Sequence, residues 1–207
     1  MSSDQQNEMK PVLRALHTWW FGPLDGPLAR NPEKTEMWFK RSDETDTHCR
    51  RNFGAYLPIA ASIDWDLDDL TREEKVGLVL LLDQMPRNIH RESGEAFAYD
   101  AKAREIAGKL LAAGLGAFYL VEQSFVCLPL EHSEDVADQD RSVLLFAEMA
   151  VTAPEGLEET KRNGLDFATK HRDLIRKFGR FPHRNAVLGR QSTEEEEAFL
   201  AEHGRGF

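Results

Sequence analysis

The stretch from Thr71 to Pro86 constrains the fold more than any other part of the chain. Thr71 is followed three residues later by Glu74, the spacing of a capping box, in which each side chain binds a backbone N–H at a helix start. The run 76–85 that follows is apolar on nearly every side, so we expect this helix at the centre of a core. Pro86 predicts its end.

Helical patterns continue along most of the chain. Pro11 suits a first helical turn, Asn31-Pro32 and Ser42 are start signals, and a second capping box begins at Thr193. Residues 1–8 are expected to be disordered. No stretch alternates with a period of two, which favours an all-α fold of antiparallel helix pairs joined by short turns. The helices are expected at 11–21, 32–39, 43–57, 72–85, 96–113, 118–125, 134–151, 155–178 and 194–200.

Length and composition narrow the class of protein. A chain of 207 residues is long enough for one well-buried core, and we expect a single domain over 1–207. The net charge of -10 argues against general nucleic-acid binding, which favours a basic face. No apolar run approaches the roughly 18 residues of a membrane span. Cys49 and Cys127 form no CxxC pair, which fits a reducing compartment, so we expect a cytoplasmic protein.

One loop is basic, although the chain as a whole is acidic. Residues 178–190 hold three arginines, a histidine and an asparagine, and no Asp or Glu occurs between Leu174 and Thr193. A shorter turn, Arg87 to Arg91, has a similar Pro-Arg-Asn pattern. Guanidinium groups bind carboxylate or phosphate through two parallel bonds. We expect the two turns to lie side by side, with Asp83 or Glu131 between them.

The arginines have two possible partners, and the sequence leaves both open. Asp83, Asp100, Glu131 and Glu134 could pair with them in an internal network, or the loop could bind an anionic ligand. Asn88 and Asn185 each follow an arginine and are expected to hydrogen-bond the turn backbone.

Two histidines are candidates for chemistry. His171 follows Phe167 and Ala168 by about one turn and precedes Leu174 and Ile175, so we expect it to be buried with a polar partner. It is either a core imidazole or a general base. His132 lies near the N-terminus of a long helix, where its acidic neighbours could simply interact favourably with the helix dipole. The spacing of His132, His171 and His183 matches no local zinc pattern, and no metal site is predicted.

Several segments of the chain occur together in one known family: Trp19-Trp20-Phe21-Gly22, Trp38-Phe39, Leu82 to Arg91, Asp100, Leu128 to Glu134, Gln139, His171 and Phe178 to Arg190. By these segments the chain resembles a bacterial family of uncharacterised proteins, domain-of-unknown-function family 924, over nearly its whole length. The resemblance implies an all-helical fold similar to tetratricopeptide repeats, a stack of antiparallel helix pairs, and it implies no activity. The cofactor, if any, is unknown.

Three functions follow from these residues. The first is a site for a small anionic ligand bearing phosphate or carboxylate, with His132 and His171 as candidate catalytic residues. The second is an interaction module that grips an acidic peptide in a concave surface. The third is a structural network in which the polar motifs pair with one another. The expected ligand-binding residues are Arg87, Asn88, Arg91, Glu131, Arg180, His183, Arg184 and Asn185.

Overall fold

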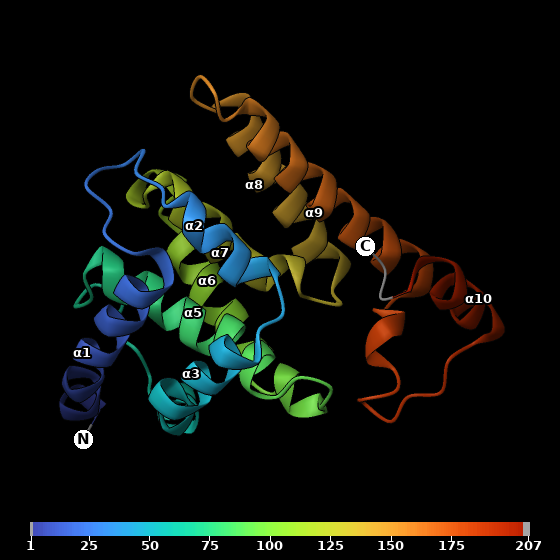
Figure 1. The fold of residues 1–207 in the computed structure, drawn as a ribbon, viewed down its shortest axis with the longest axis horizontal. Coiled ribbons are helices and arrows are strands. Elements are labelled where there is room, and N and C mark those ends of the chain that lie inside the picture. Colours follow the sequence, from blue (N-terminus) through green and yellow to red (C-terminus); the bar gives the residue numbers. More distant parts are fainter. Residues whose placement is uncertain (1, 205–207) are drawn as a thin grey trace. The chain divides into compact units, whose positions relative to one another are not determined.

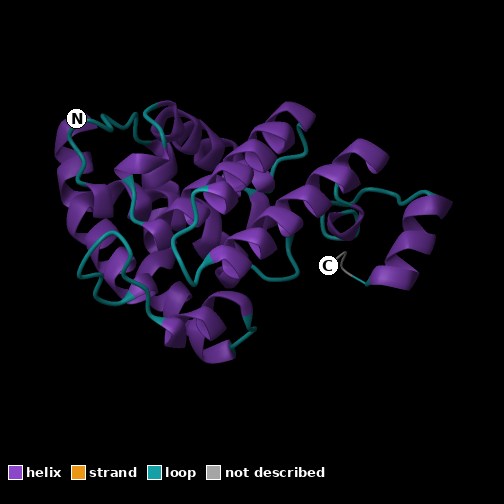
Figure 2. Ribbon diagram, turned by 90° about the horizontal axis from the view of Figure 1, so that it is seen from above, coloured by secondary structure: helices purple, strands orange, loops and turns teal. Residues whose placement is uncertain are grey.

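The computed structural model describes residues 2–204 and is all-α, as the sequence predicts. Figure 2 shows helices connected by loops, and no strand occurs within residues 2–204. The tetratricopeptide-like stacking stays a prediction. The chain divides into two compact units, the first with Met1–Arg91 and Glu95–Pro129, the second with Glu92–Gly94 and Leu130–Phe207. The single domain expected over 1–207 also stays a prediction.

Helix α5 (Arg72–Ile89) is the centre of the first unit. It packs against four other helices of that unit, and its residues from Val76 to Leu82 are almost completely buried. Its capping box is formed: the Thr71 N–H donates to Glu74 Oε2 at 2.8 Å, and Thr71 Oγ1 accepts from the Glu74 N–H. Glu74 also pairs with Arg14 of α1. The helices around α5 are α1 (Ser2–Phe21), α3 (Asp43–Phe53), α4 (Leu57–Ser62) and α6 (Asp100–Ala112).

Two further helices complete the first unit. Helix α2 (Pro32–Phe39) begins after Asn31 with proline in its first turn, as predicted. Helix α7 (Leu120–Glu131) enters the second unit with its last two residues. Short 3-10 turns occur at Gly54–Tyr56, Gly94–Phe97 and Leu115–Ala117. Within this unit, the rings of Trp20, Phe21, Trp38 and Phe125 pack edge to face or stacked, with centroids 5.0–6.5 Å apart.

The expected end at Pro86 is wrong, because α5 continues to Ile89. Proline at position 86 removes only the backbone bond to the Leu82 carbonyl, and side-chain donors add bonds to two other carbonyl groups of the same turn. Arg87 Nη1 donates to Asp83 O at 2.8 Å, and Asn88 Nδ2 donates to Gln84 O at 2.9 Å. Met85, Pro86 and Ile89 are buried, so packing also favours the helix. Arg87 and Asn88 therefore lie on a helix rather than in a turn.

Two other boundaries also differ from the prediction. Helix α7 passes through Pro129, which is buried with Leu130 and Val126, so packing offsets one lost hydrogen bond. Residues 2–8 are helical rather than disordered, because Gln6 is buried and holds the α1 start. Its Nε2 donates to Asp66 O and Asp69 Oδ2, each at 3.1 Å. Met1 lies outside the described residues.

A helix hairpin forms most of the second unit. Helices α8 (Val136–Val151) and α9 (Glu158–Phe178) run antiparallel and side by side (Figure 1). Asp135 caps α8, because its carboxylate accepts from the Ala137 N–H at 2.8 Å. Gly179 ends α9 with φ of 69°, the left-handed conformation expected there. A 3-10 turn at Pro182–Arg184 and helix α10 (Glu194–His203) follow.

Gly77 sets how closely α1 and α5 approach. A Cβ added there would lie 2.8 Å from the Leu13 carbonyl carbon and closer still to its oxygen. Alanine favours a helix by about 1 kcal/mol over glycine, but overpacking against backbone costs about 1–3 kcal/mol. We expect Gly77→Ala to lower the free energy of unfolding, measured in urea. Gly116→Ala is the control, since nothing lies within 4 Å of its added Cβ. A more stable Gly77→Ala variant would contradict the close approach.

Candidate functional site

Arg87 and Arg91 of the first unit bind carboxylates of that unit. Arg87 forms two parallel bonds to Asp100, at 2.8 and 2.9 Å, and its Nη1 lies 3.3 Å from Asp83 Oδ1. Arg91 forms two bonds to Asp46, at 2.5 and 2.8 Å. Such pairs link the end of α5 to α6 and α3. The internal network foreseen in the sequence is therefore present here.

Asn88 belongs to the same set of contacts. Its Oδ1 accepts from Arg91 Nη2 at 2.7 Å, while its Nδ2 donates to the backbone of α5. The side chain is 8% exposed. Asn88 therefore bonds the backbone, as expected, and also orients Arg91 towards Asp46.

Arg180 and Asn185 of the second unit converge on Glu196 at the start of α10. Arg180 donates to both Glu196 oxygens, at 2.7 and 2.8 Å. Asn185 Nδ2 donates to Glu196 Oε2 at 3.2 Å, and the Thr193 N–H donates to the same oxygen at 2.8 Å. The Arg180 hydrogen bonds, with the Thr193 N–H, lower the pKa of Glu196 to about 2. Glu196 thus caps α10. It also links that helix to residues 178–190, the arginine-rich loop that we call the cationic loop.

Glu134 fixes the middle of the cationic loop. Arg190 donates to its two oxygens at 2.7 and 2.9 Å, and the Phe181 N–H donates to Oε1 at 2.8 Å. Burial raises the pKa of Glu134, but the Arg190 hydrogen bonds outweigh it, and the pKa is lowered. Arg190 Nε also donates to Asn185 Oδ1 at 2.9 Å. The backbone around Phe181 is therefore held from both sides.

Three of the remaining predicted residues, His171, His183 and Arg184, pack against the fully buried ring of Phe181, while Glu131 and His132 interact with His171. The Arg184 guanidinium carbon lies 4.4 Å from the ring centroid, and the His183 and His171 rings lie 5.5 and 5.6 Å from it. His171 Nδ1 is 3.3 Å from Glu131 Oε1. We call this set the Phe181 cluster: Phe181, Glu131, His132, His171, His183 and Arg184.

His171 has a strongly lowered pKa, and the burial of its side chain is the main cause. Its side chain is 16% exposed, and Nδ1 bonds the Phe167 carbonyl at 2.9 Å, which agrees with the expected burial and polar partner. Burial, together with the charges of His132, Arg184 and His183, lowers the pKa of His171 to about 3. The hydrogen bond to the Phe167 carbonyl acts in the opposite direction and is outweighed. The imidazole is therefore neutral at pH 7.

Comparisons of sequence and of fold relate this chain to known proteins. The family described as "Bacterial protein of unknown function (DUF924)" matches residues 16–204. The chain belongs to this family. A solved structure, the protein of unknown function ATU0120 from Agrobacterium tumefaciens, is 32% identical, with a TM-score of 0.74 over 93% of this chain and 99% of that one. A search of curated proteins finds no match.

The structure distributes the predicted site residues of this DUF924 protein over both units. Arg87, Asn88 and Arg91 lie in the first unit, and the other predicted residues lie in the second. The side-by-side arrangement of the two turns stays a prediction. Sequence reasoning missed Glu196 as the partner of Arg180, although its place in a capping box made it a carboxylate with a fixed position. It also missed the ring of Phe181 as the centre of the cluster.

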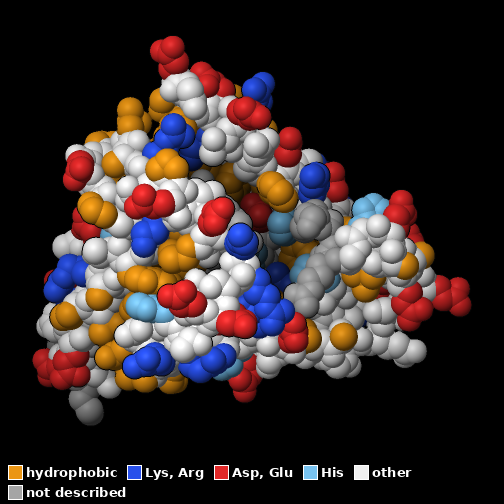
Figure 3. Space-filling view, in the orientation of Figure 1, with side chains coloured by type: hydrophobic (Ala, Val, Ile, Leu, Met, Phe, Trp, Pro, Cys, Tyr) orange, Lys and Arg blue, Asp and Glu red, His pale blue; other side chains and the backbone are white. Residues whose placement is uncertain are grey.

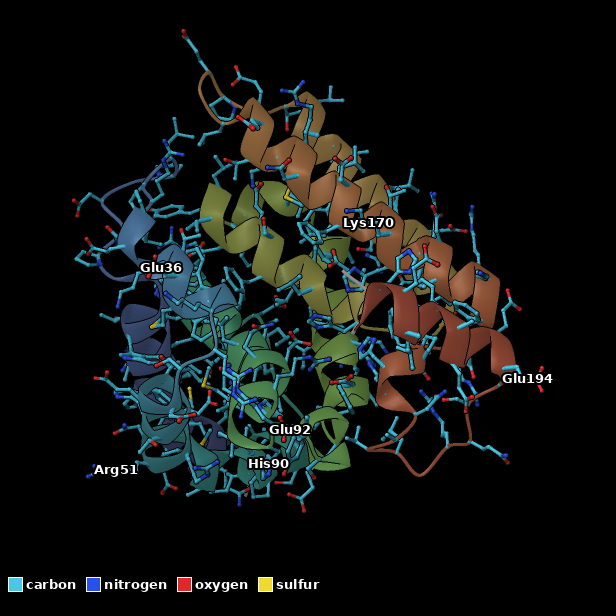
Figure 4. All side chains as sticks on the ribbon, turned by 45° about the vertical axis from the view of Figure 1, so that its right-hand side comes forward. Glu36, Arg51, His90, Glu92, Lys170 and Glu194 are labelled. Carbon is cyan, nitrogen blue, oxygen red and sulfur yellow. The ribbon has the colours of Figure 1, made fainter. Side chains whose placement is uncertain are left out.

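Other surfaces offer less to a ligand. A shallow hollow of about 450 Å³ is lined by residues of α3 alone, and Arg51 extends outward from it (Figure 4). A ligand site needs groups that converge from several elements. On the face drawn in Figure 3, charges of both signs are interspersed with apolar side chains. The hollow is lined by Asp43, Glu44, Thr47, His48, Arg51 and Asn52.

No three His, Cys, Asp or Glu side chains of residues 2–204 are placed to hold a metal ion. The absence of a metal site in the protein stays a prediction. In the same range, no helix combines the length and apolar character of a membrane span.

Glu196 gives a prediction for the pH dependence of stability. Its pKa is lowered in the folded state, from 4.5 to about 2, so its contribution is complete above about pH 4.5 and is lost as the pH falls towards 2. We expect Glu196→Gln to lower the free energy of unfolding by about 1–2 kcal/mol at pH 7. The loss should shrink towards zero near pH 2, in urea unfolding at a series of pH values. The exposed Glu197→Gln is the control, and an equal loss there would contradict the assignment.

His171 gives a prediction for direct titration. Because its folded pKa is lowered from 6.5 to about 3, the unfolded state binds the extra proton first, and His171 makes folding less favourable as the pH falls from 6.5 towards 3. We expect the His171 ring signals in NMR to stay those of a neutral imidazole from pH 8 to pH 5. A midpoint near 6.5 would show that the ring is solvated. Assignment by comparison with His171→Gln identifies the signals.

Proposed function

We propose that this DUF924 protein binds a small anion, with phosphate or carboxylate groups, at the Phe181 cluster. The observation that carries the proposal is the placement of the buried Arg184 guanidinium 4.4 Å from the Phe181 ring centroid, with the His171 and His183 rings packed against the same ring. A positive potential in a largely buried place stabilises an anion more strongly than it would in water. A forked guanidinium over an aromatic ring suits carboxylate and phosphate.

The Phe181 cluster favours binding over catalysis by His171. A general base works best when its pKa lies near the operating pH, and a pKa of about 3 is far below it. The neutral ring can still take part in hydrogen bonds to a ligand. We place the protein in the cytoplasm as part of this proposal, in keeping with its two free, buried cysteines.

A structural role is the second candidate, and a specific observation favours it for part of the motif. Arg87, Arg91, Arg180 and Arg190 each make two-bond pairs with carboxylates of their own unit. Such pairs fix the geometry of helix ends and loops and add little net stability. We therefore assign these four arginines to the scaffold, and we propose Arg184 for the anion because its guanidinium lies over the Phe181 ring beside His171 and His183. An acidic peptide is an alternative to a small anion as the ligand of Arg184 and the Phe181 cluster.

Arg184 separates the two candidates. It is 6% exposed, so Arg184→Ala removes a buried side chain, and Arg184→Lys is the more informative change because it keeps the charge and loses the fork. We expect Arg184→Lys to weaken citrate or inorganic phosphate binding at least about tenfold, equal to about 1.4 kcal/mol. Isothermal titration calorimetry measures the affinity.

The control is Arg176→Lys, on the same helix as His171 but half-exposed and paired with Asp140 at 2.6 Å. It should bind as the wild type does. Circular dichroism and urea unfolding show whether each variant is folded. Unchanged affinity in a folded Arg184→Lys protein, or no binding of citrate, phosphate or an acidic peptide to the wild type, would contradict the proposal and leave the structural role.

A further inference from the structure

Gln139 of α8 lies against the turn that carries Glu131 and His132. Its side chain is completely buried, and Nε2 donates to Glu131 O and Ser133 O, both at 2.6 Å. Because the nitrogen faces two carbonyl oxygens, the orientation of the amide is determined. Its oxygen, Oε1, then points away from these carbonyls and has no hydrogen-bond partner within residues 2–204.

Ser142 presents a second such atom one helical turn further on. It is also completely buried, and its Oγ has no hydrogen-bond partner in the described chain. Residues three apart on a helix share a face. Gln139 and Ser142 therefore place an acceptor and a hydroxyl close together, where nearly all buried polar groups in proteins are satisfied.

The pairing of α8 with α9 brings this face to the Phe181 cluster. Lys161 Nζ lies 3.8 Å from Met149 Sδ, and Gly164 lies against the Phe146 ring. In an antiparallel pair, each step back along α8 is a step forward along α9. The same register sets Ser142 opposite Ala168 and Gln139 opposite His171. Two unsatisfied polar atoms thus adjoin the cluster that we propose as the anion site.

We infer that the bound anion carries a hydroxyl or ammonium group, and that this group donates a hydrogen bond to Gln139 Oε1. A ligand hydroxyl can accept from Ser142 Oγ at the same time, whereas an ammonium group can donate to both oxygens. The ligand class is then a hydroxy- or amino-substituted carboxylic acid. This inference rests on the proposed function, because the Phe181 cluster supplies the charge that holds the carboxylate.

Matched acids test the donor group separately from the charge. Citrate and tricarballylate share three carboxylates and differ by one hydroxyl, and malate, aspartate and succinate differ only at one carbon. A site built around a hydrogen bond discriminates strongly against a ligand that lacks the group. We expect citrate, or malate or aspartate, to bind the wild type at least about tenfold more tightly than its unsubstituted partner in calorimetry.

Two substitutions locate the discrimination. Ser142→Ala removes one hydroxyl from a helix. It should reduce the ratio of the citrate affinity to the tricarballylate affinity several-fold, while the tricarballylate affinity stays unchanged. Gln139→Met should reduce the ratio to about one. Gln139→Met can fail to fold, because the carbonyls of the Glu131 turn lose their donor. In that case the affinity ratios of the wild type and of Ser142→Ala still decide whether the ligand's donor group binds here. Ser62→Ala on the exposed surface of α4 is the control.

The outcomes distinguish this inference from the proposed function. Equal affinities within every pair, lost together in Arg184→Lys, would uphold the anion site and overturn the donor group. That result is also expected if a buried water satisfies Gln139 and Ser142. Failure of every acid to bind would overturn both. A ratio above about ten that survives Ser142→Ala and Gln139→Met would place the donor elsewhere and overturn the inference as well.

Discussion

An arginine that is partly removed from water favours a carboxylate partner, because its charge loses part of the solvation that water supplies. In this DUF924 protein that constraint decides how helices end. Arg87 and Arg91 at the end of α5 bind Asp100 and Asp46, so the last turn of the central helix is fastened to its neighbours. In the second unit Arg190 fastens Glu134 in the same way. An acid-free loop in the sequence is therefore not an acid-free environment in the fold.

Local patterns were sufficient for much of the architecture. Both capping boxes form, Asn31-Pro32 begins a helix, and Gly179 ends one, because each signal depends on backbone groups within a few residues. The expected breaks at Pro86 and Pro129 failed for the opposite reason. Whether a helix survives proline depends on how the residues around it pack, such as the buried Met85, Pro86 and Ile89, and propensity does not describe that packing.

The candidate site was predicted as a set of residue types rather than as an arrangement. The sequence showed an excess of arginine in one loop, and His171 is largely buried, as its helical neighbours indicated. It could not show which arginines bind carboxylates of the protein. Arg180 and Glu196, for example, belong to different sequence motifs and come together only in the fold. Nor could it show that Gln139 would keep an unsatisfied oxygen beneath the Glu131 turn.

The two capping glutamates have a consequence for local unfolding. Glu74 and Glu196 each cap a helix with one oxygen and bind an arginine from another segment with the same carboxylate, Arg14 in one case and Arg180 in the other. Opening the first helical turn therefore weakens the tertiary contact, and releasing the arginine weakens the cap. Two events that could be independent become one cooperative step. The start of α10 and the cationic loop should accordingly exchange their amide hydrogens as a single unit.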